Sequence, residues 1–352
     1  MIRPRLVVDR ALQGRPLLSL IAGDVLVALL ISVVIIVWLA LSGRNSEDLL
    51  ITSAISGILV VGYQSFVGNT GIVSFGHMAF MGFGAYAAGI VSVPVDEKAF
   101  TLPNLPGVLR DHAVGLFPSM LVGGIVAMIV AIPTGFVLMR LTGAAAGITT
   151  LGLLVIANEV FRNAESFTRG TQTFFGVPQS TTVWWVYGTL IVTVALAVTL
   201  KFSPLGLRAR AVRDDPLAAE TAGINIVRAR MWPWVVSAFI TGLGGALWAH
   251  QLTAFSPKSF YIAASVPVIV MAVLGGIDSI VGAMLGTIAL TAWLEVIRRV
   301  EAGHLGPVSF PDLTGIAQFS IGVGLIFLLW RRPSGIMASN ELDLEPGRGR
   351  RR

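Results

Sequence analysis

Residues 116–141 read LFPSMLVGGIVAMIVAIPTGFVLMRL, an apolar run in which Arg140 is the single charged residue. A helix needs about 20 apolar residues to cross a bilayer, so this run predicts a membrane-spanning helix. The whole chain has the same character, with 55% hydrophobic and 12% charged residues, whereas soluble domains carry about 25% charged residues. The predicted fold class is therefore an all-α polytopic membrane protein.

Similar apolar runs lie on both sides of this stretch. Together they predict about ten segments: 25–41, 49–67, 71–93, 116–141, 144–161, 183–200, 231–252, 262–274, 280–297 and 313–330. The first is followed by SGRNSED without a cleavage site, so we interpret it as a retained span. Residues 262–274 are too short to cross alone, and eight or nine crossings plus a re-entrant segment stay an alternative. We thus expect about 8–10 transmembrane helices.

Two stretches are rich in glycine: GIVSFGHMAFMGFGAYAAG at 71–89 and LGGIDSIVGAMLG at 274–286. Small residues let helices pack closely, and they also permit a broken or re-entrant helix where it lines protein or water. Transporters often carry matched broken segments near the substrate path. Tight packing explains any single glycine at least as well, and a lone histidine in a helix interface is more often a packing residue than a relay or a substrate contact. The translocation-path candidates are Ser74, His77, Tyr86, Gly275 and Gly276.

The charge distribution indicates an orientation. The chain has 25 lysine and arginine residues, a formal net charge of +6 and a pI near 10.3. In a membrane protein this balance indicates a positive cytoplasmic face and no nucleic-acid partner. With the N-terminus inside and ten crossings, most basic residues fall inside. The predicted organisation is a cytoplasmic segment at 1–24, a transmembrane domain at 25–331 with a cytoplasmic loop at 201–230, and a basic cytoplasmic tail at 332–352.

Several catalytic motifs are missing from the chain. It contains no cysteine, no Gly-Lys pair, no HExxH and no GxSxG. These absences exclude a Walker A nucleotide site, a zinc protease centre and a serine-hydrolase elbow. We therefore predict no catalytic residue and no metal site. An ion-coupled secondary transporter stays open, because Glu159, Glu295 and Asp278 are ionisable groups near span ends or turns.

The stretch RAVRDDPLAAETAGIN at 210–225 is a polar interruption between apolar runs. Asp215 suits a helix N-cap, Pro216 suits the first helical position, and Gly223 suits the left-handed residue that ends a helix. The resulting helix of about seven residues is too short to be stable alone. It either lies on its own bundle or docks on a soluble partner. Three positions at helical spacing are predicted to share one face: Leu217, Thr221 and Ile224.

From Gly206 the chain reads GLRARAVRDDPLAAETAGINIVRARMWPWVVSAFITGLGGALWAH. This stretch resembles the cytoplasmic loop and following span of the branched-chain amino acid ABC importer permeases, the LivM-like subunits. Four more stretches match in family order, namely 68–86, 150–178, 268–287 and 322–338, so the resemblance covers most of the chain. A departure is Thr168-Arg169-Gly170, where the family has a TGG-like turn. Whether Arg169 alters specificity is open.

The resemblance implies a role for the loop. In this family it holds an EAA-like segment that docks on the ATPase. The implied coupling residues are Arg213, Asp214, Asp215, Pro216, Leu217, Ala218, Ala219, Glu220, Gly223 and Asn225.

The resemblance also implies an assembly and a substrate class. The implied partners are a second, LivH-like permease, two cytoplasmic ABC ATPases that use ATP and Mg²⁺, and an extracytoplasmic solute-binding protein. The chain itself would bind no cofactor and would lie in the bilayer of the bacterial cytoplasmic membrane. The implied substrates are branched-chain or other hydrophobic amino acids. A permease for urea or short amides, an ion-coupled carrier and a structural scaffold are the alternatives.

Overall fold

The computed structural model describes residues 46–301, 304–305, 308–309, 319–320, 322–324, 326, 331 and 335. Seven helices in this part of the chain are long and apolar enough to cross a membrane. The strands described there are the two-residue β1 (His304–Leu305) and β2 (Val308–Ser309), which pair antiparallel. The predicted all-α polytopic fold is confirmed. The expected span at 25–41, the segment at 1–24, and most of 313–330 and of the tail lie outside the described residues.

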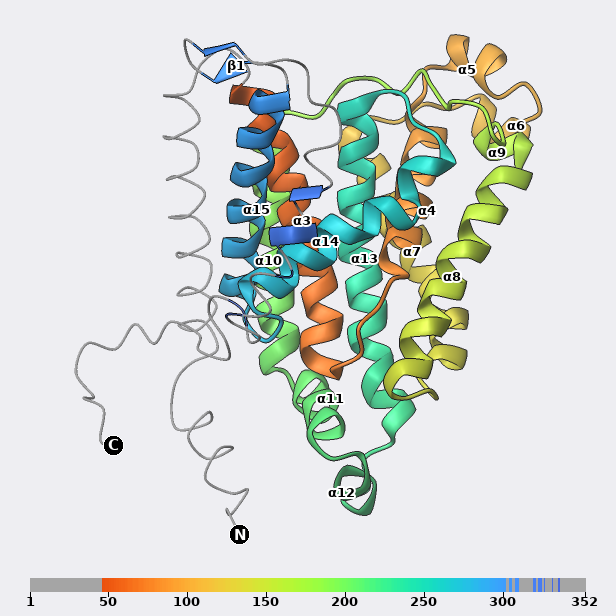
Figure 1. Ribbon diagram of the computed structural model, residues 1–352. Coiled ribbons are helices and arrows are strands. Elements are labelled where there is room, and N and C mark those ends of the chain that lie inside the picture. Colours follow the sequence, from red (N-terminus) through yellow and green to blue (C-terminus); the bar gives the residue numbers. More distant parts are fainter. Residues whose placement is uncertain are drawn as a thin grey trace.

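The helices run along a common axis between two ends of the molecule (Figure 1). The long helices are α3 (Ser46–Thr70), α4 (His77–Ser92), α7 (Leu116–Leu138), α8 (Gly143–Asn163), α10 (Val183–Phe202), α13 (Ile226–Leu252), α14 (Ile262–Gly275) and α15 (Ile280–Glu301). At one end, which we call the loop end, lie α11 (Pro204–Asp214) and α12 (Pro216–Thr221). The opposite end carries α5 (Val95–Thr101), α6 (Gly107–Arg110) and α9 (Glu165–Thr168).

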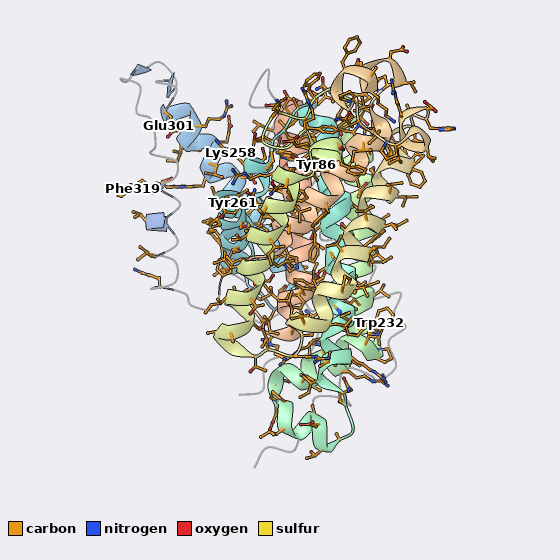
Figure 2. The ribbon with its side chains drawn as sticks, turned by 90° about the vertical axis from the view of Figure 1, so that its right-hand side faces the viewer. Tyr86, Trp232, Lys258, Tyr261, Glu301 and Phe319 are labelled. Atoms are coloured by element: carbon orange, nitrogen blue, oxygen red, sulfur yellow. The ribbon has the colours of Figure 1, made fainter. Side chains whose placement is uncertain are left out.

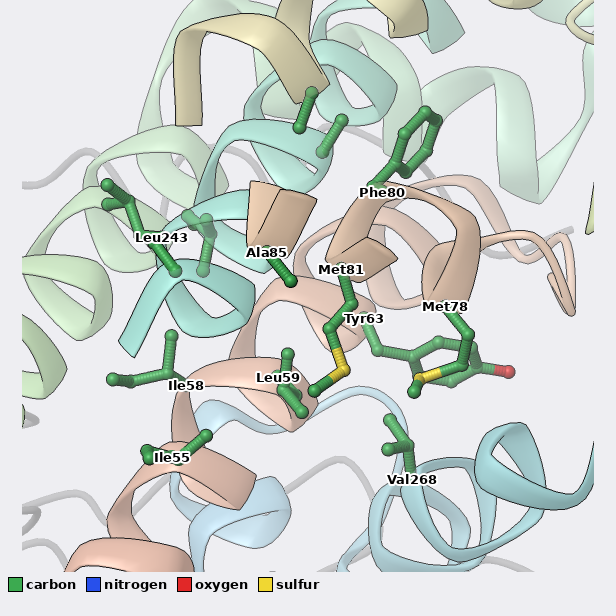
Figure 3. Packing of buried hydrophobic residues seen from close by; sticks show 14 of the residues in the cluster. Ile55, Ile58, Leu59, Tyr63, Met78, Phe80, Met81, Ala85, Leu243 and Val268 are labelled. Carbon is green, nitrogen blue, oxygen red and sulfur yellow. The ribbon is translucent and has the colours of Figure 1, made fainter. Parts of the chain in front are cut away.

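Helix α13 is at the centre of the packing. It lies against α3, α4 and α7, and α3 is itself mostly buried. Figure 3 shows this core from close by, with Ile58 and Leu59 of α3 near Met81 of α4 and Leu243 of α13. Close approach depends on a missing side chain, because a Cβ atom added to Gly84 of α4 would overlap the carbonyl oxygen of Gly242. Small residues thus let these backbones touch, as helices in membranes commonly do.

Both glycine-rich stretches are broken, as the sequence predicts. Residues 71–76 are not helical, so α3 ends at Thr70 and α4 begins only at His77, partway along the body (Figure 1). In the second stretch Gly276 has φ +113°, a conformation that side chains rarely adopt, and α15 begins four residues later at Ile280. We call residues 71–76 the first break and residues 276–279 the second break.

The segment predicted to be too short to cross forms α14. Its 14 residues correspond to about 21 Å of helix, less than the roughly 30 Å of a hydrocarbon core. A 3₁₀ turn, η1 (Pro257–Phe260), precedes it, and η1 and α14 together form the 19-residue stretch Pro257–Gly275, one of the seven that are long and apolar enough to cross a membrane. The segment predicted to be too short is therefore long enough once η1 is included. Figure 1 shows that α14 covers only part of the height of the body before the second break.

The outer faces of the peripheral helices are apolar and exposed. Phe136 of α7, Ile156 of α8 and Trp184 of α10 are examples. An apolar surface of this extent on several helices fits contact with lipid or with another apolar protein surface. The two tryptophans at the start of α10, Trp184 and Trp185, occupy a helix end, where aromatic residues concentrate in membrane proteins.

Candidate functional site

The loop between α10 and α13 is built from two capped helices. Ser203 caps α11, because its hydroxyl accepts a hydrogen bond from the Gly206 amide over 3.2 Å. Asp215 caps α12, because Oδ1 accepts from the amides of Leu217 and Ala218 at 3.0 Å each. Both helices have proline in their first turn, where no amide hydrogen is needed. The predicted cap at Asp215 is confirmed.

The end of α12 also follows the prediction. Gly223 has φ +81°, and its amide donates to the Glu220 carbonyl oxygen over 2.9 Å. The Ile224 amide then donates to the Ala219 carbonyl oxygen over 3.0 Å. A left-handed glycine with two backward hydrogen bonds is the common way to end a helix. The helix spans six residues, one fewer than the sequence predicts.

The predicted shared face of α12 is wrong. Leu217 and Thr221 are exposed, Leu217 by 76% of its surface, whereas Ile224 packs against a small apolar cluster at the base of the loop. The reason is that the helix ends at Gly223, so helical spacing does not continue to Ile224. The buried members of the cluster are Val212, Ala219 and Ala229. Helix α12 therefore stands on the body through Ala219 and presents Leu217, Ala218 and Glu220 to the outside.

Arg213 points away from that exposed face. Its Nη1 donates to the carbonyl oxygen of Gly68, near the end of α3, and to Oδ1 of Asp278 in the second break, each over 2.5 Å. The hydrogen bond that Arg213 donates to Asp278, together with the negative charge of Asp278, raises the pKa of Arg213 above the ordinary arginine value. This guanidinium thus connects three segments that are far apart in sequence.

The remaining predicted coupling residues have different positions. Asp214 is the exposed last residue of α11, and Pro216 lines a cavity described below. Asn225 caps α13, because its Oδ1 accepts from the Arg228 amide over 2.9 Å. The predicted set therefore divides into an exposed face on α12 and residues that hold the loop in place.

The second break is held by groups that the sequence analysis did not connect with the loop. Lys201 Nζ, at the end of α10, donates to the Asp278 carbonyl oxygen over 2.7 Å. Gln64 of α3 donates from Nε2 to the Ile277 carbonyl oxygen over 3.2 Å. Within the break, Ser279 Oγ accepts from the Gly282 amide over 3.0 Å. Sequence reasoning treated Asp278 only as a candidate for ion coupling, since nothing in its spacing pointed to Arg213.

A cavity of about 800 Å³ lies between the loop and both breaks. Its lining includes Gly71 and Ile72 of the first break, Ile277 and Asp278 of the second, and Arg213 of α11. Pro216 of α12 and Arg230 near the start of α13 complete the wall on the loop side. The loop between α10 and α13 and the two glycine-rich breaks thus face one space, which no single segment of the sequence indicates.

The path candidates Ser74 and His77 lie together in the core. His77 Nδ1 is 3.0 Å from Ser74 Oγ, and His77 Nε2 is 3.1 Å from Ser237 Oγ on α13. The imidazole is enclosed by aromatic rings of Tyr63, Phe66, Phe80 and Trp234. Both ring nitrogens therefore have partners inside the closed core. In this conformation the histidine has the contacts of a packing residue.

Tyr86, the third candidate, lies nearer the opposite end of the body, whereas Trp232 lies close to the loop end (Figure 2). The Tyr86 ring contacts the rings of Phe161, Phe174 and Phe255, with ring centroids 5.0 to 5.7 Å apart. The Tyr86 hydroxyl is buried without a hydrogen-bond partner among the described residues. The candidates therefore do not form one site: Gly275 ends α14 and Gly276 begins the second break, whereas Tyr86 belongs to an aromatic cluster.

The two glutamates considered for ion coupling have local partners. Glu159 is exposed and accepts from Asn163 Nδ2 over 2.7 Å on the same helix. Glu295 is buried on α15 and pairs with Arg298 over 2.9 Å. Neither residue lines the cavity at the loop end.

Comparison with known proteins identifies the family. Residues 45–303 match the model of the branched-chain amino acid transport system permease component. The chain belongs to this family. No solved structure matches the chain.

Curated relatives of this permease agree with the family. It is 25% identical to the high-affinity branched-chain amino acid transport system permease LivM of Salmonella typhimurium, over 90% of this chain and 76% of that protein. It is 23% identical to LivH of Escherichia coli, over 81% of this chain and 92% of that protein. A shorter region, 19% of this chain and 22% of the relative, is 39% identical to the guanosine ABC transporter permease NupQ of Bacillus subtilis. Relatives of both kinds, LivM and LivH, thus match this chain, and the LivM match covers more of it.

Proposed function

We propose that this permease is the LivM-like membrane-spanning subunit of an ABC importer, and that α12 is the helix on which partner ATPases act. The observation that carries the proposal is the short, doubly capped helix α12, which exposes Leu217 at the loop end. An apolar side chain on a helix that cannot fold alone fits a docking element better than a solvated loop. The chain contains no Walker lysine, so the energy of ATP has to enter from another subunit.

The proposed assembly contains a LivH-like permease, two cytoplasmic ATPases that bind ATP and Mg²⁺, and an extracytoplasmic solute-binding protein. Closure of the ATPases on ATP would displace α12 and switch the membrane helices between outward- and inward-open states. The loop end would then be cytoplasmic, in agreement with its arginine content. The bilayer would be the bacterial cytoplasmic membrane.

The proposed substrates are branched-chain or other hydrophobic amino acids, in keeping with the names of the LivM and LivH relatives. The glycine-rich breaks, with Ser74, His77, Gly275 and Gly276, are the proposed region of the translocation path, and Tyr86 marks its other half. Helix N-termini at such breaks can present amides to a substrate carboxylate.

The docking role is tested in vesicles that contain the permease, its partner permease, both ATPases and the binding protein. Glu220→Arg combined with Gly223→Trp places charge and bulk on the docking surface and should abolish ATP-dependent uptake of labelled leucine. The matched control is Val108→Arg on α6, because Val108 is 83% exposed and lies at the opposite end. Full uptake by the double variant, with normal insertion, would contradict the docking role.

The same vesicles separate an importer from an ion-coupled carrier. An importer subunit should move no leucine when the ATPases are left out, even with a pH or sodium gradient across the membrane. Uptake by the purified chain alone under such a gradient would support the carrier and overturn the importer.

A further inference from the structure

The loop carries one contact that docking on an ATPase does not require. Only Asp214 and Asp215 separate Arg213 from the first residue of α12, yet the side chain of Arg213 turns inward. Docking calls for groups on the outer surface of α12, such as Leu217. Arg213 instead joins α11 to the end of α3 and to the second break.

Asp278 is held from two sides. Its carboxylate accepts from Arg213, and its backbone carbonyl accepts from Lys201 at the end of α10. The neighbouring Ile277 carbonyl is bound by Gln64 of α3. The second break is therefore fastened by discrete polar contacts, and one of them comes from the helix that leads directly into α12.

The first break meets the same side chain. A Cβ atom added to Gly71 would lie 2.9 Å from Cγ of Arg213, so the aliphatic part of the arginine rests on the start of that break. Its guanidinium binds the Gly68 carbonyl just before the break. A displacement of Arg213 consequently acts on both breaks, which share the cavity of about 800 Å³.

The Arg213–Asp278 pair is also suited to breaking and re-forming. The side chains are 30% and 38% exposed, in contrast to the closely packed helices around them. Partly hydrated ion pairs contribute little net free energy, so exchange of partners costs less than moving a packed helix interface. A charge-assisted hydrogen bond nevertheless fixes the relative direction and distance of its two side chains while it is formed.

We propose that Arg213 and Asp278 are positioning residues that pass the movement of α12 to both glycine-rich breaks, and that their ion pair keeps the breaks together at the loop end. This inference rests on the proposed function, since it needs α12 to be the element that the ATPases move. Neither residue has to touch the solute or the ATPase. Loss of the pair should separate ATP hydrolysis from transport.

The first test measures uptake and ATPase rate in the complete reconstituted complex with labelled leucine. Arg213→Gln and Asp278→Asn should each lower uptake about tenfold, the size of a typical coupling between sites, while ATP hydrolysis continues. Arg213→Lys keeps the charge and three donors, so it should restore most of the uptake. The matched control is Arg208→Gln, an exposed arginine on the same helix, which should leave uptake unchanged. Equal uptake in Arg213→Gln and Arg208→Gln would overturn the proposal.

The second test uses the absence of native cysteine in the chain. Val73→Cys places a thiol on the lining of the cavity, and the rate of its reaction with a maleimide reports the opening of the breaks. Addition of ATP and vanadate should change this rate about fivefold or more. The change should vanish when Arg213→Gln is added and persist when Arg208→Gln is added.

The outcomes of the second test distinguish the two proposals. A nucleotide response that survives Arg213→Gln contradicts the ion-pair link but leaves docking on α12 in place. A missing response in the Val73→Cys complex itself contradicts the proposed coupling, and the link with it. Misfolding is monitored by co-purification of the partner subunits, and Arg213→Lys provides a second variant that keeps the contact.

Discussion

Helices α4 and α13 meet where Gly84 faces Gly242 and their backbones touch, whereas α12 rests on the body through Ala219 and a few caps. The first region is held by van der Waals contact over whole helix faces. This attraction is lost as soon as the helices separate. The second is held by individual hydrogen bonds near water, which exchange readily. A closely packed core and a loop held by a few hydrogen bonds are the arrangement that the proposed coupling requires.

The difference also explains where polar contacts concentrate. In the core, His77 and Ser237 complete each other's hydrogen bonds inside an aromatic shell. At the loop end, Arg213 and Lys201 reach across segment boundaries to carbonyl groups that the breaks leave without helical partners. Polar contacts in the core stabilise one arrangement, whereas those at the breaks connect parts that are able to move separately.

The largest effect on stability is expected from the core. Trp234→Ala removes a fully buried indole whose Nε1 donates to the Ala131 carbonyl oxygen over 3.0 Å. The lost packing and the cavity should cost about 4 kcal/mol of unfolding free energy. Denaturant titration of the permease in bicelles measures this cost. Trp184→Ala is the control, because Trp184 is 88% exposed and should change the free energy by less than about 0.5 kcal/mol.

The second largest loss of unfolding free energy is expected at the contact between Gly84 and Gly242. Gly84→Ala adds a methyl group against the Gly242 carbonyl and should cost about 2 kcal/mol, because the helices have to move apart. The same titration measures it. Gly188→Ala on α10 is the matched control, since a Cβ atom there has no neighbour within 4 Å. Equal stability of the two variants would show that the helices do not need this close approach.

Loss of a helix cap in the loop should lower stability by a smaller amount, and only within the loop. Asp215→Ala removes the two amide contacts at the start of α12 and should cost about 1 kcal/mol of local helix stability. Hydrogen exchange of residues 216–222 should become faster while exchange in α13 is unchanged. Faster exchange throughout α13 would mean that the loop and the core unfold together, which would remove the contrast between them.

The smallest effect on stability is expected at the exposed leucine of α12. Leu217→Ser should leave the unfolding free energy within about 0.5 kcal/mol of the parent, because its side chain has few contacts to lose. Uptake in the complete complex should nevertheless fall if this leucine docks on the ATPase. A variant that loses stability but keeps uptake would place Leu217 in the fold and not in the docking surface.

Much of the loop could be predicted from local sequence. Asp215, Pro216 and Gly223 determine where α12 begins and ends, because caps, proline and left-handed glycine act through the nearest backbone groups. The prediction failed at Ile224, where helical spacing was continued past the residue that ends the helix. Its apolar side chain then follows the turn and packs at the base of the loop.

Sequence alone determined that the chain is a helical membrane protein with two broken glycine-rich segments, since apolar length and missing side chains are local properties. Only the tertiary structure decided that Arg213 meets Asp278, 65 residues away along the chain, and that the loop and both breaks border one cavity. It also decided that His77 is enclosed, with both nitrogens bonded. Such contacts depend on which helices pack together, and that choice arises from the summed packing of many side chains and not from any short stretch.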